Sequence, residues 1–350
     1  MISKKVLNDQ KQVPAFVGGY CALLATLLSV FQILEHLTCF SDPDCQTKIV
    51  RILFMVPLYA LISWFSILAP GAATYLDLIR DAYEAYAIYA FFSLMLAFMG
   101  GMDSLYRTLM VEEREPIAHF FPFCWMEPVK VTPRFVQACR RSLFQFMVLK
   151  PLVSFVVIIL TTKGEMGDSV TDVSKGSFWT ALVYNISITI ALYGLVYFYA
   201  GTKEFLEGKG ALAKFLCIKA IIFLSYWQGF AIAILAAANV LPTFNYWTKE
   251  EAPQGLQDFL ICIEMLLVAF AHKFCFGSDD YAVDASSSES AADSISMKEK
   301  DGVNNGSVGG PIGASGRYIP PARMSVMSNL KYTLRHEDLI TEVKDIVRNR

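Results

Sequence analysis

Charged residues are scarce in this chain. Asp, Glu, Lys and Arg make up 18% of its 350 residues, whereas a soluble domain carries about 25%. Hydrophobic residues make up 55%, and the mean hydropathy is +0.43. The formal net charge is −2, so the chain has no overall positive field that would attract nucleic acid. This balance excludes an ordinary soluble protein and indicates a polytopic membrane protein.

Residues suited to metal, redox or histidine chemistry are also few. The eight cysteines include no C-x-x-C pair, and the four histidines form no H-E-x-x-H motif. No two of the histidines share a face of a predicted helix; they are His36, His119, His272 and His336. Because zinc and redox sites need such clusters, we predict no metal, no cofactor and no enzyme activity.

Long apolar runs dominate the first three quarters of the chain. A bilayer core requires about 20 mostly apolar residues per helix. Seven segments approach or exceed this length: 13–34, 49–70, 81–102, 145–161, 177–200, 214–241 and 256–276. The first of them is too long for a signal-peptide core and lacks a cleavage site, so we interpret it as a retained span. The sequence therefore predicts an all-α membrane protein with seven transmembrane helices, formed by residues 1–276.

The remaining residues, 277–350, have a different composition. The stretch that begins "GSDDYAVDASSSESAADSISMKEKDGVNNG" is rich in Ser, Gly and Asp and has few large apolar residues. Such a segment cannot bury enough surface to order itself, so we predict that most of this tail is disordered. The final stretch regains a mild amphipathic period, which predicts a short helix near 330–348.

The distribution of basic residues predicts the orientation. Lys and Arg are more numerous in the short loops on the side of the tail than in the loops on the side of the N-terminus. Cytoplasmic loops carry the excess of Lys and Arg. We therefore expect the N-terminus outside and the tail in the cytosol, although the pair Lys4 and Lys5 favours the opposite orientation.

Four stretches carry a resemblance to a known family. They are "KIVRILFMVPLYALISWFSIL", "YLDLIRDAYEAYAIYAFFSLM", "KFLCIKAIIFLSYWQG" and "DFLICIEMLLVAFAHKFCF". In order and spacing they resemble the organic solute transporter alpha / transmembrane protein 184 family, from the first span to the seventh. The transporter-alpha branch has a dense cysteine cluster in the loop between spans three and four, where "HFFPFCWMEP" has Cys124 alone. The chain is therefore more similar to the transmembrane protein 184 branch.

The resemblance implies a seven-helix transport-type fold in the plasma membrane or an endomembrane. Its better-known branch moves bile acids and steroid conjugates together with a single-span beta partner. We therefore expect a transporter or facilitator of amphipathic organic solutes, namely steroid, bile-acid-like or lipid anions. The alternative is a non-transporting scaffold that regulates trafficking or signalling through its tail. Besides membrane lipids, a single-span partner subunit and a homo-oligomer both remain open.

Polar residues in the sixth and seventh spans are candidates for a binding site, because charges in a bilayer are costly and often functional. At 1.5 Å per residue, Lys219 lies about 8 Å from the cytosolic start of the sixth span and Gln228 about 21 Å. Glu264 lies about 18 Å from the cytosolic end of the seventh span. We therefore expect Gln228 and Glu264 to pair, with Trp227 and Tyr226 as apolar walls.

Lys219 belongs to a separate, cytosol-facing layer of the predicted span. It is nine residues from Gln228, which is roughly 180° around an α-helix. Its ammonium group can either reach back to the cytosolic headgroups or bind an anionic solute.

A second group of candidates lies at the start of the third span. Arg80 and Glu84 are four residues apart and can pair on a helix. Tyr83, Tyr86 and Glu84 can line an outer vestibule for the solute. The alternative is a plain helix N-terminus with acidic residues matched to its dipole.

Two cysteines are candidates for lipid attachment. Cys124 lies in the aromatic stretch "FFPFCW", and Cys139 precedes two arginines. Cytosolic cysteines at a membrane surface are substrates for palmitoylation.

Overall fold

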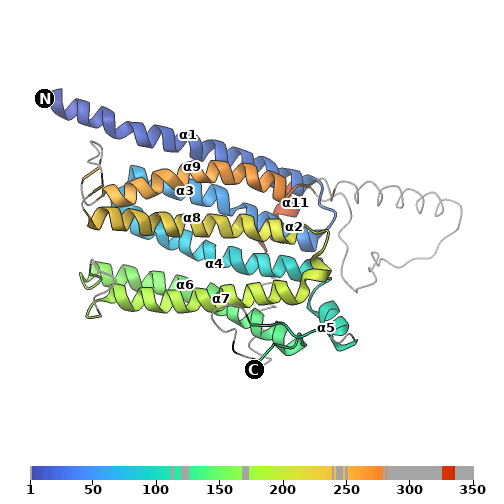
Figure 1. Ribbon diagram of the computed structural model, residues 1–350. Helices are drawn as coiled ribbons and strands as arrows, with labels where there is room; N and C mark the ends of the chain where they lie inside the picture. The colour runs from blue at the N-terminus through green and yellow to red at the C-terminus, as the bar shows by residue number, and fades with distance from the viewer. Residues whose placement is uncertain are drawn as a thin grey trace, which may run out of the picture.

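The computed structural model describes residues 2–111, 114–119, 125, 127–167, 173–238, 240–241, 247–248, 251–278, 281 and 325–335, without the side chains of residues 2–12 and of several residues in the sixth predicted span. These residues are helical apart from their connections, and an isolated antiparallel bridge joins Ile117 to Val129. The long helices lie side by side in an elongated bundle, with α1 at one edge and α6 and α7 at the other (Figure 1). The all-α prediction is confirmed.

Each predicted span coincides with a long helix or a pair of helices. The elements are α1 (Ile2–Thr38), α2 (Pro43–Leu53), α3 (Met55–Leu68), a 3-10 turn (Pro70–Ala72), α4 (Ala73–Phe98), α5 (Met102–Val111), α6 (Pro133–Thr162), α7 (Gly176–Leu206), α8 (Ala211–Ala237), α9 (Ala252–Cys275) and α11 (Val326–Leu334).

Prolines and glycines determine where these helices begin and break. The second predicted span divides into α2 and α3 because Pro57 has no N–H to donate to the carbonyl of Leu53. α6 begins with Pro133 in its first turn, where the Thr132 side chain accepts from the N–H of Phe135. Gly100 and Gly101, with φ of 78° and 87°, turn the chain between α4 and α5.

Four helices in the described part of the chain are long and apolar enough to cross a membrane: Val13–Thr38, Pro43–Leu68, Pro133–Thr162 and Gly176–Leu206. A fifth is obtained if Pro70–Phe98 and Met102–Val111, which are bent by 58°, form one span. The structure therefore supports an integral membrane protein with four or five candidate spans. Seven spans with the N-terminus outside stay a prediction.

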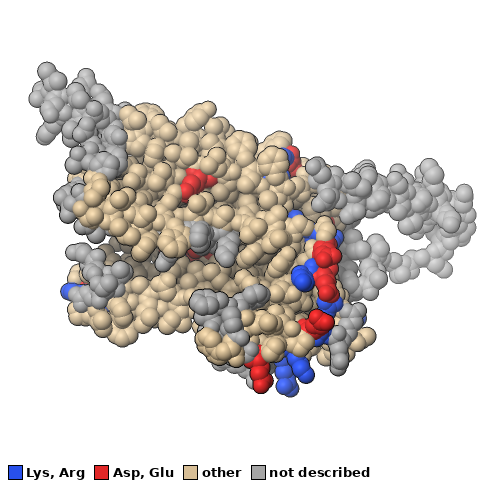
Figure 2. All heavy atoms as spheres, viewed as in Figure 1, with Lys and Arg blue, Asp and Glu red and all other residues tan. Residues whose placement is uncertain are grey.

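The surface of the bundle fits a lipid environment. Large hydrophobic side chains are exposed along α1, α6, α7, α8 and α9, where lipid would cover them. In Figure 2 the middle of the visible face is almost free of charge, and basic and acidic side chains gather at the end where α5 lies. The bundle thus has an apolar middle and one strongly charged end.

α11 is the described helix of the tail. It overlaps the predicted helix near 330–348 only at its C-terminal half, and residues 336–350 lie outside the described part. The segment 282–324, for which we predict disorder, also lies outside it. α11 packs on α1 and α2, at the end of the bundle where α9 ends (Figure 1).

Candidate functional site

Charged side chains inside the bundle start from one face of α4. Asp77, Arg80, Asp81 and Glu84 follow the spacing i, i+3, i+4, i+7, which places them on one side of a helix. Together with Lys150 of α6 and Asp258 of α9 they form what we call the charged layer: Asp77, Arg80, Asp81, Glu84, Lys150 and Asp258. The prediction from sequence for this stretch of α4, a vestibule or a helix N-terminus, does not include Asp77, Lys150 or Asp258.

One half of the charged layer is centred on Arg80. Its guanidinium contacts Asp77 at 2.6 Å and Asp258 at 3.1 Å, and donates to Ser63 Oγ at 3.1 Å. Gln254 Nε2 donates to the second oxygen of Asp258 at 3.1 Å. The Asp258 side chain is 1% exposed, so this ion pair joins α3, α4 and α9 inside the protein.

The predicted partner of Arg80, Glu84, belongs to the other half of the layer. The Tyr59 hydroxyl donates to Glu84 Oε2 at 3.2 Å. Lys150 Nζ lies 3.2 Å from Asp81 Oδ1 and 3.9 Å from the centre of the Tyr184 ring, a cation–π contact. These contacts join α4 to α3, α6 and α7.

The charged layer has an excess of acid. It contains four carboxylates and two cations, and its members are mostly buried. Taking charges out of water costs several kcal/mol per ion unless each is paired, and intramembrane charges usually serve a function. The bonds of the layer connect α4 to α3, α6, α7 and α9 at this level.

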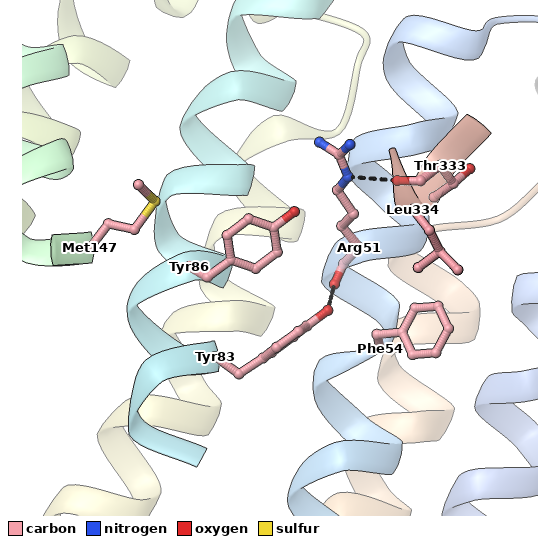
Figure 3. Close-up of a pocket in the computed structure, with 7 residues that line it drawn as sticks. All are labelled: Arg51, Phe54, Tyr83, Tyr86, Met147, Thr333 and Leu334. Atoms are coloured by element: carbon pink, nitrogen blue, oxygen red, sulfur yellow. Dashed lines mark hydrogen bonds between the residues drawn. The ribbon is translucent and has the colours of Figure 1, made fainter. Parts of the chain in front are cut away.

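A cavity lies beside this layer. Its volume is about 440 Å³, and it is lined by Arg51, Phe54, Tyr83, Tyr86, Met147, Thr333 and Leu334 (Figure 3). This volume falls in the range of about 300–1,000 Å³ that is usual for small-molecule sites. The Tyr83 hydroxyl donates to the backbone carbonyl of Arg51 at 2.5 Å, and the rings of Tyr83 and Tyr86 meet edge to face.

The cavity corrects the predicted position of the vestibule. Tyr83 and Tyr86 share a site, but Glu84 bonds to Tyr59 and is not among the lining residues. Thr333 and Leu334 come from the tail. The cavity therefore belongs to the side of the bundle that holds the tail, which is the cytosolic side on the predicted orientation, and not to the outer side. Arg51 was not identified from the sequence, and the helix predicted near 330–348, which overlaps α11 in part, was not expected to line a site.

The predicted meeting of the sixth and seventh spans occurs. Gln228 Nε2 of α8 donates to Glu264 Oε1 of α9. Trp227 next to it is 49% exposed, on the outer surface of the bundle. None of these residues lines the cavity described above. The side chains of Lys219 and Tyr226 lie outside the described part of the structure.

The two candidates for lipid attachment differ. Cys139 is buried in the core on α6, 5% exposed, so its acylation would require the thiol to leave this packing. Cys124 lies outside the described residues. Among the residues that the structure describes, no group of three or more His, Cys, Asp or Glu side chains is arranged to hold a metal ion.

Comparison with known proteins gives one family. The sequence model described as organic solute transporter Ostalpha matches residues 14–281, which include every helix of the charged layer and the cavity except α11. No solved structure matches the chain. The match covers more than half of the sequence, and it leaves α11 outside.

Proposed function

The chain belongs to the organic solute transporter Ostalpha family, and we propose that it moves amphipathic organic solutes, such as steroid, bile-acid-like or lipid anions, across a membrane. The observation that carries this proposal is the cavity beside the charged layer. Phe54, Tyr86, Met147 and Leu334 offer it an apolar wall, which suits the ring system or chain of such a solute.

The charged layer is proposed to act as the closed gate of this cavity. On α4, the lining residue Tyr83 directly precedes Glu84 of the layer. On α6, the lining residue Met147 is one turn before Lys150. Two helices thus lead from the cavity into the layer within a single turn. A solute can pass only when the bonds of the layer separate, a rearrangement of packed helices that transporters use to alternate access.

Filling the cavity tests the function. We expect Met147→Trp to lower uptake of dansylaminoundecanoic acid into proteoliposomes by about tenfold or more, because a steric loss of about 1.4 kcal/mol in binding suffices. Val148→Trp is the matched control, because Val148 is 43% exposed on the surface of the same helix. If the unaltered chain and Met147→Trp take up the probe equally well, the cavity does not hold the solute. No uptake by the unaltered chain would favour the scaffold alternative.

The pair of Gln228 and Glu264 is proposed as a second polar contact of the solute. We expect Glu264→Gln to keep the fold, because the amide still fits the hydrogen bond and interhelical hydrogen bonds contribute only about 0.6 kcal/mol. Removal of a negative charge should raise uptake of the anionic probe about threefold and leave its neutral methyl ester unchanged. The measurement is flux normalised to folded protein. Equal flux of both probes in the variant would reduce the pair to helix packing.

A further inference from the structure

α11 is held on the bundle by a small set of specific contacts. Asn329 Nδ2 donates to the carbonyl of Leu37 at 2.9 Å, near the end of α1 where carbonyls have no partner within the helix. Asn329 and Thr333 are buried, at 5% and 0% exposed. Tyr332 meets Phe40 edge to face with ring centres 6.2 Å apart. The tail is thus docked by α11 in a defined register.

The other end of α11 is bound by Arg51 of α2. Arg51 Nε donates to the carbonyl of Thr333 at 3.1 Å, and Nη2 donates to the carbonyl of Arg335 at 3.4 Å. Carbonyls at a helix C-terminus lack partners within the helix and carry the negative end of its dipole. Arg51 therefore caps α11. In Figure 3 Thr333 and Leu334 lie across the cavity from Tyr83 and Tyr86.

We propose that Arg51 recognises the anionic group of the solute and that α11 is a built-in competitor for it. The carbonyls of α11 occupy guanidinium donors that a carboxylate or sulfate would use, and Leu334 occupies part of the apolar wall. A carboxylate bonds to guanidinium in a bidentate, charge-assisted manner and is the stronger acceptor. This inference rests on the proposed function and adds the regulation of its site.

The docking of α11 is weak enough for such competition. The helix has nine residues, and a helix this short is marginal in water without packing. Met327, Tyr332 and Leu334 are each about half or more exposed, at 72%, 47% and 54%, so α11 rests on the bundle along one narrow face. Release of α11 removes the carbonyls of Thr333 and Arg335 from Arg51. An anion in the cavity can then accept from the same guanidinium donors.

Weakening the dock tests the competition in the full chain. Asn329→Ala removes the bond to Leu37 without altering the cavity. It should tighten binding of dansylaminoundecanoic acid about fivefold, because one hydrogen bond contributes about that factor when the state with α11 docked dominates. Met327→Ala, at an exposed position of the same helix, should leave binding unchanged. In the Asn329→Ala background, Arg51→Gln should abolish the preference for the acid over its methyl ester. Unchanged affinity for the acid in Asn329→Ala would overturn the proposal.

A cross-link that holds α11 on the bundle should have the opposite effect on binding of the acid. Phe40→Cys with Tyr332→Cys, bridged by a bis-maleimide, should abolish binding of the acid, whereas the same reagent on either single variant should not. Met147→Trp separates this proposal from the proposed function. If Met147→Trp blocks binding while bridging and Asn329→Ala have no effect, the cavity is the solute site and only the competition is wrong. If Met147→Trp binds the probe normally, the proposed function itself is wrong.

Discussion

Replacing Lys150 with Leu should lower the free energy of unfolding by about 3–5 kcal/mol, the usual cost of removing one partner from a buried ion pair. The Lys150 side chain is 9% exposed and pairs with Asp81, 3.2 Å away. Without it, this half of the charged layer keeps two carboxylates, on Asp81 and Glu84, and has no cation. The cation–π contact with Tyr184 is lost as well.

Three further variants identify the cause of that loss. Lys150→Arg keeps the charge and should retain most of the stability, although the planar guanidinium group fits the site less well than the ammonium group. Lys150→Leu combined with Asp81→Asn removes both members of the pair and should recover part of the loss. Lys163→Leu, at an exposed position after the end of α6, should cost little. The measurement is the thermal midpoint in detergent, and an unchanged midpoint in Lys150→Leu would show that the pair does not stabilise the fold.

The depth of a side chain along its helix could be predicted from the sequence. The direction in which it points around the helix axis mostly could not. Gln228 and Glu264 meet as expected, because the rise per residue converts sequence position into depth directly. Lys150 was missed because it is the single charge in an otherwise apolar span, and Asp258 because it lies at the start of a span in which Glu264 lies deeper. Their partners depend on how α6 and α9 are rotated against α4, and no property of the single segments contains that rotation.

The charges of α4 are an exception that the sequence could have revealed. Their spacing of three and four residues places Asp77, Arg80, Asp81 and Glu84 on one helix face, and a face with four charges in a span must point into protein rather than lipid. The pairing expected for Arg80 with Glu84 used only local spacing. The buried carboxylate of Asp258 on another helix is a further partner, and local spacing carries no information about it.

The sequence indicated Tyr83 and Tyr86 as lining residues of a site, but it did not indicate that Arg51 and the tail line the same cavity. Arg51 and Thr333 are 282 residues apart, and the tail between α9 and α11 has the composition of a disordered segment. Hydropathy ends the transmembrane domain at residue 276, and thereby separates two lining residues of the cavity from the rest. A composition-based domain boundary therefore hides a helix that docks back on the bundle.

The two ends of the Arg80 ion pair should respond very differently to mutation. Arg80→Met leaves the carboxylates of Asp77 and Asp258 without their cation, and should cost about 3–5 kcal/mol of unfolding free energy. Asp258→Asn should cost about 1 kcal/mol or less, because Arg80 keeps Asp77 at 2.6 Å and the amide oxygen still accepts from the guanidinium. Gln254, which donates to the second oxygen of Asp258, can flip its own amide to face the new NH2 group.

This asymmetry follows from the acid excess of the layer, because removal of an acid relieves repulsion whereas removal of a base increases it. The double variant Arg80→Met with Asp258→Asn should therefore be more stable than Arg80→Met alone, and a double-mutant cycle of thermal midpoints measures the difference. Asp258→Asn should also retain solute uptake, or increase it, since one bond between α4 and α9 in the proposed gate becomes weaker. Equal destabilisation by the two single variants would contradict the role of charge balance and would assign stability to the geometry of the pair alone.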